Sequence, residues 1–100
     1  MSEWIKVLEF LPKPGVMTEV EVNGKALLIA EFDGQFYGAE NRCPHEDIKL
    51  SLGCLKAGRV QCSLHGYSFD LATGQSSDVD VESMQTYPVK VENNCIFIEI

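Results

Sequence analysis

The stretch that decides the fold begins with Cys43-Pro-His45 and, after sixteen intervening residues, continues with Cys62-Ser-Leu-His65-Gly66. Each motif pairs one thiol with one imidazole, and together they hold both histidines of the chain. Thiolates and imidazoles are ligands of transition metals, so the four side chains can serve two metal ions, one through the thiolates and one through the imidazoles.

Three other readings of these four residues have to be weighed. A single Cys or His is usually a packing residue, but two tight pairs that use every histidine are hard to ascribe to packing. Structural zinc uses the same donor set, although zinc fingers usually pair Cys with Cys and His with His. A Cys/His nucleophile site is weaker, because no orienting third group or oxyanion cradle stands at a recognisable spacing.

The sequence around the motifs predicts short strands joined by tight turns. Asn23-Gly24 and Asp33-Gly34 are hairpin signals, because both turn residues must tolerate positive φ. Asn93-Asn94 is a third turn. The predicted strands are 16–22, 25–32, 35–39, 58–62, 67–71, 87–92 and 95–100. No segment of ten residues carries a helical period, and Ser76–Met84 is predicted to be a loop.

Hairpins at this spacing favour an all-β fold, an antiparallel sandwich or barrel. One hundred residues make one domain, 1–100, with the chemistry-bearing part at about 41–75. Of the two remaining cysteines, Cys95 is expected in the core of the last strand, and Cys54 is expected to be a small buried hydrophobe.

Charge and composition exclude several classes of function. The net charge of −7 argues against nucleic-acid and anionic membrane partners, and it suits either a basic protein partner or plain solubility. No apolar run approaches the roughly 20 residues that cross a bilayer, and the N-terminus lacks the features of a secretory signal. We therefore expect a cytoplasmic protein.

The motifs and their surroundings resemble those of the small Rieske ferredoxins of bacterial multicomponent oxygenases. The likeness extends from Val7 to Ile100 and includes Phe36–Asn41 before the first motif and Gly58–Cys62 leading into the second. It also includes Leu50-Ser51, Gly53, Phe69, Thr73-Gly74 and Tyr87-Pro88-Val89.

The resemblance implies a Rieske fold, in which a smaller subdomain of two hairpin loops holds one Rieske-type [2Fe–2S] cluster above a sandwich or barrel base. Cys43 and Cys62 would bind one iron, and His45 and His65 the other. Two neutral imidazoles in place of two thiolates make the site less negative, which raises the reduction potential relative to all-Cys ferredoxins.

The family also implies the role and the partners. The chain would be a non-catalytic, monomeric electron carrier between a flavin-containing NAD(P)H reductase and a terminal oxygenase of aromatic hydrocarbon catabolism. That oxygenase would be a ring-hydroxylating dioxygenase or a di-iron monooxygenase, and Cys43–Ile48 followed by Leu50-Ser51 is closer to the monooxygenase ferredoxins. The alternatives are the small Rieske-like subunit of an NAD(P)H nitrite reductase and a zinc-stabilised interaction module.

Several positions depart from the high-potential relatives of respiratory membranes. Ile48 and Leu64 occupy the positions of a disulfide, and Phe69 occupies that of a tyrosine hydroxyl. Fewer donors to the cluster sulfurs predict a potential near the low end of the Rieske range, roughly −150 mV. Glu46 and Asp47, with Tyr67 on the other arm, are candidates for a docking face or a solvated turn.

Overall fold

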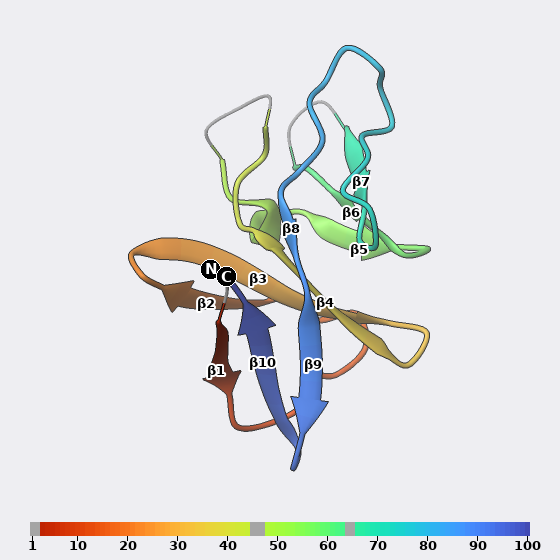
Figure 1. The fold of residues 1–100 in the computed structure, drawn as a ribbon. Helices are drawn as coiled ribbons and strands as arrows, with labels where there is room; N and C mark the ends of the chain where they lie inside the picture. Colours follow the sequence, from red (N-terminus) through yellow and green to blue (C-terminus); the bar gives the residue numbers. More distant parts are fainter. Residues whose placement is uncertain (1–2, 45–47, 64–65) are drawn as a thin grey trace.

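The computed structural model describes residues 3–44, 48–63 and 66–100, and these form an antiparallel β fold (Figure 1). Its three sheets have the strand orders β1-β10-β9, β2-β3-β4-β8 and β5-β6-β7. Within these ranges the one helical element is a 3₁₀ turn, η1 (Leu50–Leu52). No helix of the described chain is long and apolar enough to cross a membrane. The strands are β1 (Trp4–Leu8), β2 (Thr18–Val22), β3 (Lys25–Phe32), β4 (Gln35–Glu40), β5 (Cys54–Lys56), β6 (Arg59–Gln61), β7 (Ser68–Asp70), β8 (Thr86–Tyr87), β9 (Val89–Glu92) and β10 (Cys95–Glu99).

The predicted hairpin turns are confirmed by the backbone. Asn23 and Gly24 have φ values of 52° and 82°, and Asp33 and Gly34 have 55° and 82°. Asn93 and Asn94 are also left-handed, at 51° and 61°. Two consecutive residues with positive φ give a turn whose twist matches that of the flanking strands. The two turns at 23–24 and 33–34 therefore set the registers of β2 on β3 and of β3 on β4.

Strand β3 is the shared wall of two hydrophobic cores. Leu27, Leu28, Ile29 and Ala30 are all fully buried, and successive side chains point to opposite faces of the strand. Leu27 and Ile29 belong to the core of the base, together with Val20, Val22, Ile96 and Ile98. Leu28 and Ala30 belong to the core of the other half, together with Ala39, Cys43, Leu50, Val60, Cys62, Phe69, Leu71 and Met84.

The sheet β1-β10-β9 closes the base and brings the termini together (Figure 1). Glu3 and Ile100 exchange two backbone hydrogen bonds of 3.1 Å. Strand β1 was not predicted, because Trp4–Leu8 is bounded by no turn signal; its pairing with β10 decides its conformation. The expectation that Cys95 lies in the core is wrong. Ile96 and Ile98 fill the core, so Cys95 falls on the opposite, half-exposed side of β10.

The sheet β5-β6-β7 forms a separate small layer at the other end of the molecule (Figure 1). Strand β5 was not predicted, and it joins β6 through a tight turn at Ala57-Gly58, where both residues have positive φ. The expectation that Cys54 is buried is wrong: its side chain is exposed. In the three-residue edge strand β5 it is Leu55 that packs toward the core, so Cys54 faces outward.

Gly53, which connects η1 to β5, is required by a close approach of two backbone segments. A Cβ atom at this position would overlap the carbonyl oxygen of Gln61 in β6. The amide of Gly53 also donates to the carbonyl of Leu50 at 2.9 Å. This contact places η1 directly against the strand that leads into Cys62.

The two-sided burial of β3 predicts similar costs for truncation on either face. We expect Leu27→Ala and Leu28→Ala each to lower the free energy of unfolding by about 2–5 kcal/mol, because each leaves a cavity in a packed core. Leu52→Ala is the matched control, since this leucine is 66% exposed. Urea unfolding of the three variants measures the difference. A cost for Leu28→Ala no larger than that for Leu52→Ala would contradict the second core.

Candidate metal centre

Cys43 follows β4 and is held at the start of the first loop. Its amide donates to the carbonyl of Ile48 at 2.8 Å, which closes the base of this loop. The Cys43 side chain is fully buried within the core that it shares with Cys62. The first sequence motif therefore presents its thiol from a loop whose two ends are hydrogen-bonded together.

Cys62 stands at the corresponding position of the second loop, between β6 and β7. Its amide donates to the carbonyl of Tyr67 at 2.7 Å, and Gln61 Nε2 donates to the carbonyl of Gly66 at 3.4 Å. Gly66 has φ of +71°, a conformation that glycine adopts without strain. The Cys62 side chain is 2% exposed, so both thiols lie in the same buried environment.

The structure thus places two of the four residues predicted to bind metal. His45 and His65 lie outside the described residues, as do Glu46, Asp47 and Leu64. Among the described residues no group of three or more His, Cys, Asp or Glu side chains comes together, which is expected when neither histidine is included. The ligand set as a whole stays a prediction.

The chemistry of the two described residues fits an iron–sulfur cluster. Neither Cys43 nor Cys62 forms a disulfide, and both belong to one hydrophobic core. Buried cysteines are often inert packing residues, but here each sits at the mouth of a hairpin loop that carries a histidine in sequence. Soft thiolates in an apolar, water-poor setting are the ligands that iron–sulfur clusters use.

Near the second loop, Phe69 stands where high-potential relatives have a tyrosine hydroxyl, and its surroundings agree with the expected loss of that hydrogen-bond donor. Phe69 is fully buried in the core that holds both cysteines, and its ring has no group that can donate a hydrogen bond. Tyr67 packs half-buried against the same core. Ile48 is an apolar neighbour of this core as well, and its side chain has no thiol with which to form a disulfide.

The first loop is anchored by a buried asparagine whose role was not predicted. Asn41 is 3% exposed and its Nδ2 donates to Glu19 Oε2 at 2.7 Å and to Ser51 Oγ at 2.9 Å. Its Oδ1 accepts the amide of Ser51 at 2.8 Å. These bonds connect the residue two before Cys43 to β2 and to η1. Its position just before the first motif was the available signal, since a buried amide needs partners.

Glu19 completes this anchor through an ion pair with Lys49. The Nζ atom of Lys49 lies 3.0 Å from Oε1 and 2.9 Å from Oε2 of Glu19. The hydrogen bond from Lys49 lowers the pKa of Glu19 below its ordinary value, with the Asn41 amide helping and burial opposing the shift. Both side chains are well exposed, so the pair orients Asn41 more than it stabilises the fold.

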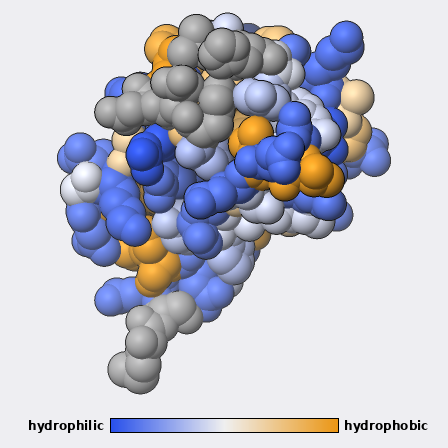
Figure 2. All heavy atoms as spheres, turned by 90° about the horizontal axis from the view of Figure 1, so that it is seen from above, coloured by the Kyte–Doolittle hydropathy of each residue, from blue (hydrophilic) through white to orange (hydrophobic). Residues whose placement is uncertain are grey.

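The loop between Gly74 and Thr86 covers the same core. Phe69 forms an isolated bridge with Ser76, while Val81 and Met84 pack onto the core that contains both cysteines. The backbone between 77 and 83 has neither helix nor strand, which confirms the predicted loop. Viewed from this end, the surface is mainly hydrophilic with separate small hydrophobic patches (Figure 2).

Comparison with known sequences gives a consistent family. The Rieske [2Fe–2S] domain matches residues 3–88. The ferredoxin component of the naphthalene 1,2-dioxygenase system of Pseudomonas aeruginosa is 33% identical over 101 residues, covering 99% of this chain and 97% of that one. The corresponding component of Pseudomonas putida is 36% identical over 87 residues, covering 86% and 84%.

Comparison with solved structures confirms the predicted fold class. A ferredoxin of Sphingomonas yanoikuyae B1 superposes with a TM-score of 0.89 at 27% identity, covering 98% of this chain and 99% of that one. The ferredoxin of carbazole 1,9a-dioxygenase from Nocardioides aromaticivorans IC177 gives 0.86 at 27% identity, covering 95% of each. A ferredoxin solved with the oxygenase of carbazole 1,9a-dioxygenase gives 0.84 at 26% identity, covering 95% and 91%. With two buried thiols at the mouths of paired loops and a domain match over most of its length, the chain belongs to the Rieske [2Fe–2S] family, and its cofactor is one cluster of that type.

Proposed function

We propose that this chain is the ferredoxin of a multicomponent aromatic-ring dioxygenase, carrying single electrons from a flavin-containing NAD(P)H reductase to the terminal oxygenase. One observation carries the proposal: over nearly its whole length the chain is similar to ferredoxin components of naphthalene dioxygenase systems. A structural relative was solved in complex with the oxygenase of its own system.

Within this proposal the four motif residues hold the cluster. Cys43 and Cys62 would bind one iron, and His45 and His65 the other. When bound, such a cluster accepts and releases one electron. The protein contributes two buried thiolates in an apolar core, while the loops that close at Ile48 and Tyr67 hold their backbones in place. No residue is assigned a catalytic role in this carrier.

The choice between a dioxygenase and a monooxygenase partner rests on the similar proteins of known systems rather than on the sequence of the first motif. The sequence around Cys43–Ile48 favoured a di-iron monooxygenase, whereas the relatives described above serve dioxygenase systems, and the proposal follows them. The net charge of −7 would speed encounter with a basic partner surface. A cytoplasmic location and a monomeric state remain predictions from the sequence.

A reconstituted assay tests the proposed role against its alternatives. We expect the protein to restore NADH-dependent ring dihydroxylation when it is added to a naphthalene-type dioxygenase and its reductase, and to have no effect on nitrite reduction. Stopped-flow absorbance should show reduction by the reductase followed by reoxidation by the oxygenase. Stimulation of a nitrite reductase without transfer to the oxygenase would favour the reductase subunit instead.

The four cysteines allow a matched test of the cofactor. We expect Cys43→Ser and Cys62→Ser to abolish the red-brown colour and the iron and sulfide content, because each removes a thiolate ligand. Cys54→Ser and Cys95→Ser should keep both, since these thiols lie exposed or half-exposed outside the core. The reduced protein should give a rhombic EPR signal of low average g. A colourless wild-type protein containing zinc and no sulfide would refute cluster binding.

The anchor of the first loop gives a second test. We expect Asn41→Ala to lower the free energy of unfolding by about 1–3 kcal/mol, because it leaves the part-buried amide of Ser51 without its acceptor. Iron should also be lost faster to a chelator. Gln35→Ala is the control, since it removes an exposed hydrogen bond to Tyr37 on the strand that precedes Asn41. Equal behaviour of the two variants, measured by urea unfolding and iron release, would show that the anchor is dispensable.

A further inference from the structure

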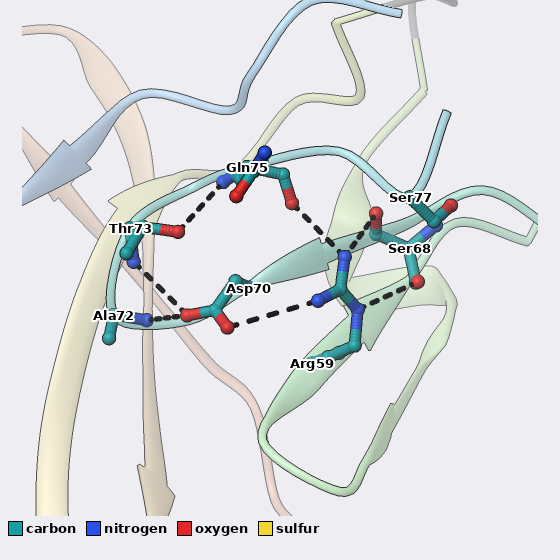
Figure 3. A network of polar contacts seen from close by, with 7 residues as sticks. All are labelled: Arg59, Ser68, Asp70, Ala72, Thr73, Gln75 and Ser77. Carbon is teal, nitrogen blue, oxygen red and sulfur yellow. Dashed lines mark hydrogen bonds and ion pairs between the residues drawn. The ribbon is translucent and has the colours of Figure 1, made fainter. Parts of the chain in front are cut away.

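The outer face of the β6–β7 hairpin carries a polar network centred on Arg59 (Figure 3). Arg59 Nε donates to Ser68 Oγ at 3.0 Å, and Nη2 donates to the carbonyl oxygen of Gln75 at 3.1 Å. A longer contact of 3.4 Å joins Nη2 to the carbonyl of Ser68. The side chain therefore starts on β6, crosses β7 and ends on the segment that returns alongside β7.

Neutral acceptors, rather than the ion pair, give this network its geometry. Arg59 Nη1 lies 3.8 Å from Asp70 Oδ2, and both side chains are about one-third exposed, at 34% and 38%. A loose, hydrated ion pair contributes little to stability. The two shorter hydrogen bonds, in contrast, use different nitrogens of one rigid, planar guanidinium, a fork that a lysine cannot reproduce. The constraint therefore depends on shape more than on charge.

Strand β7 is fixed from its outer edge by the same return segment. Ser77 donates its amide to the carbonyl of Ser68 at 2.8 Å, and Ser77 Oγ accepts the amide of Ser68 at 3.1 Å. The carbonyl of Gln75 also accepts the amide of Asp70 at 3.0 Å. The Arg59 side chain connects all three backbone segments of Figure 3, namely β6, β7 and 75–77.

The constrained backbone leads directly to the second thiol. Ser68 pairs with Gln61 in the ladder, and the neighbouring residue, Tyr67, offers the carbonyl that accepts the amide of Cys62 at 2.7 Å. On the inner face of the same hairpin, Val60 and Phe69 are fully buried in the core that contains Cys62. The hairpin is thus packed from inside and clamped from outside, within three residues of the thiol.

We propose that Arg59 is a positioning residue of the electron-transfer site: its guanidinium clamps β6, β7 and residues 75–77 together and so fixes the backbone that carries Cys62. Arg59 itself does not contact the thiol in this role. The inference rests on the proposed ligand role of Cys62. It adds that the geometry around one ligand is set by a fork of hydrogen bonds on the opposite face of the hairpin.

Two substitutions at position 59 separate shape from charge. Arg59→Lys keeps the charge but has one nitrogen in place of the fork, and Arg59→Met keeps much of the aliphatic stem without any donor. We expect a broadened EPR signal in the reduced state and several-fold faster iron release to a chelator for Arg59→Met. Arg59→Lys should show the same changes to a smaller extent, with its iron content on purification unchanged.

Two controls keep the inference falsifiable. Lys56→Met removes a positive charge from the strand next to Arg59, where Lys56 and Arg59 are ladder partners. Ile98→Val lowers overall stability through the other core. Both controls should retain the wild-type EPR line shape. Lys56→Met should do so although it loses one positive charge, as Arg59→Met does, and Ile98→Val should do so although its melting temperature is lower.

Specific outcomes would overturn the assignment. If the EPR signal and iron release of Arg59→Lys match those of the wild type, the fork of hydrogen bonds has no role. If Lys56→Met shows the changes expected for Arg59→Met, their cause is the loss of charge. If Ile98→Val shows them, their cause is the loss of overall stability. All measurements use the isolated protein with its cluster. Failure of electron transfer to an oxygenase would therefore count against the proposed partner and leave this result unaffected.

Discussion

The structure depends on one strand that is buried on both faces. Because β3 contributes Leu27 and Ile29 to the base and Leu28 and Ala30 to the other half, the two cores share a wall of backbone. A chain of one hundred residues buries too little surface to support two independent cores. Because both cores pack against β3, each half stabilises the other. The loops that carry the thiols therefore start from strands that are already packed.

The core nearer the loops has a weakness that a metal site would remove. Its sheet β5-β6-β7 has strands of only three residues, and two of its buried side chains are the thiols of Cys43 and Cys62. Metal binding and folding are coupled when ligands come from separate segments, because the bonds close long loops in the folded state alone. A cluster held by both thiols would link the segment after β4 to the segment after β6, which no described disulfide does.

Local signals in the sequence were sufficient where a single residue type determines the backbone. The turns at Asn23-Gly24 and Asp33-Gly34 require positive φ, so the hairpins that they close could be predicted. The turn at Ala57-Gly58 was not predicted because alanine rarely adopts a positive φ, and β5, which this turn joins to β6, was missed as well. Strand β1 was missed because its conformation is decided by pairing with β10, about ninety residues away in the chain.

The side of a strand on which a cysteine falls is likewise a tertiary property. Alternation in β10 is clear from the sequence, but only the packed base decides that Ile96 and Ile98 point inward and Cys95 does not. The prediction that Cys54 is buried was wrong for the same reason, because the sequence of a three-residue edge strand does not show which of its sides is buried. The four motif residues could be proposed as ligands from the sequence alone because their spacing is a chemical signal that does not depend on packing, and the ligand set stays a prediction.

The two loops are supported in physically different ways, and the difference follows from where each one begins. The first leaves the larger sheet at its interior, so its support is the buried amide of Asn41, whose unsatisfied groups would be costly. The second leaves a small hairpin, on whose outer side the partly exposed guanidinium of Arg59 bridges three segments. Both supports act on the backbone beside a thiol, because Asn41 stands two residues before Cys43 and Arg59 three residues before Cys62.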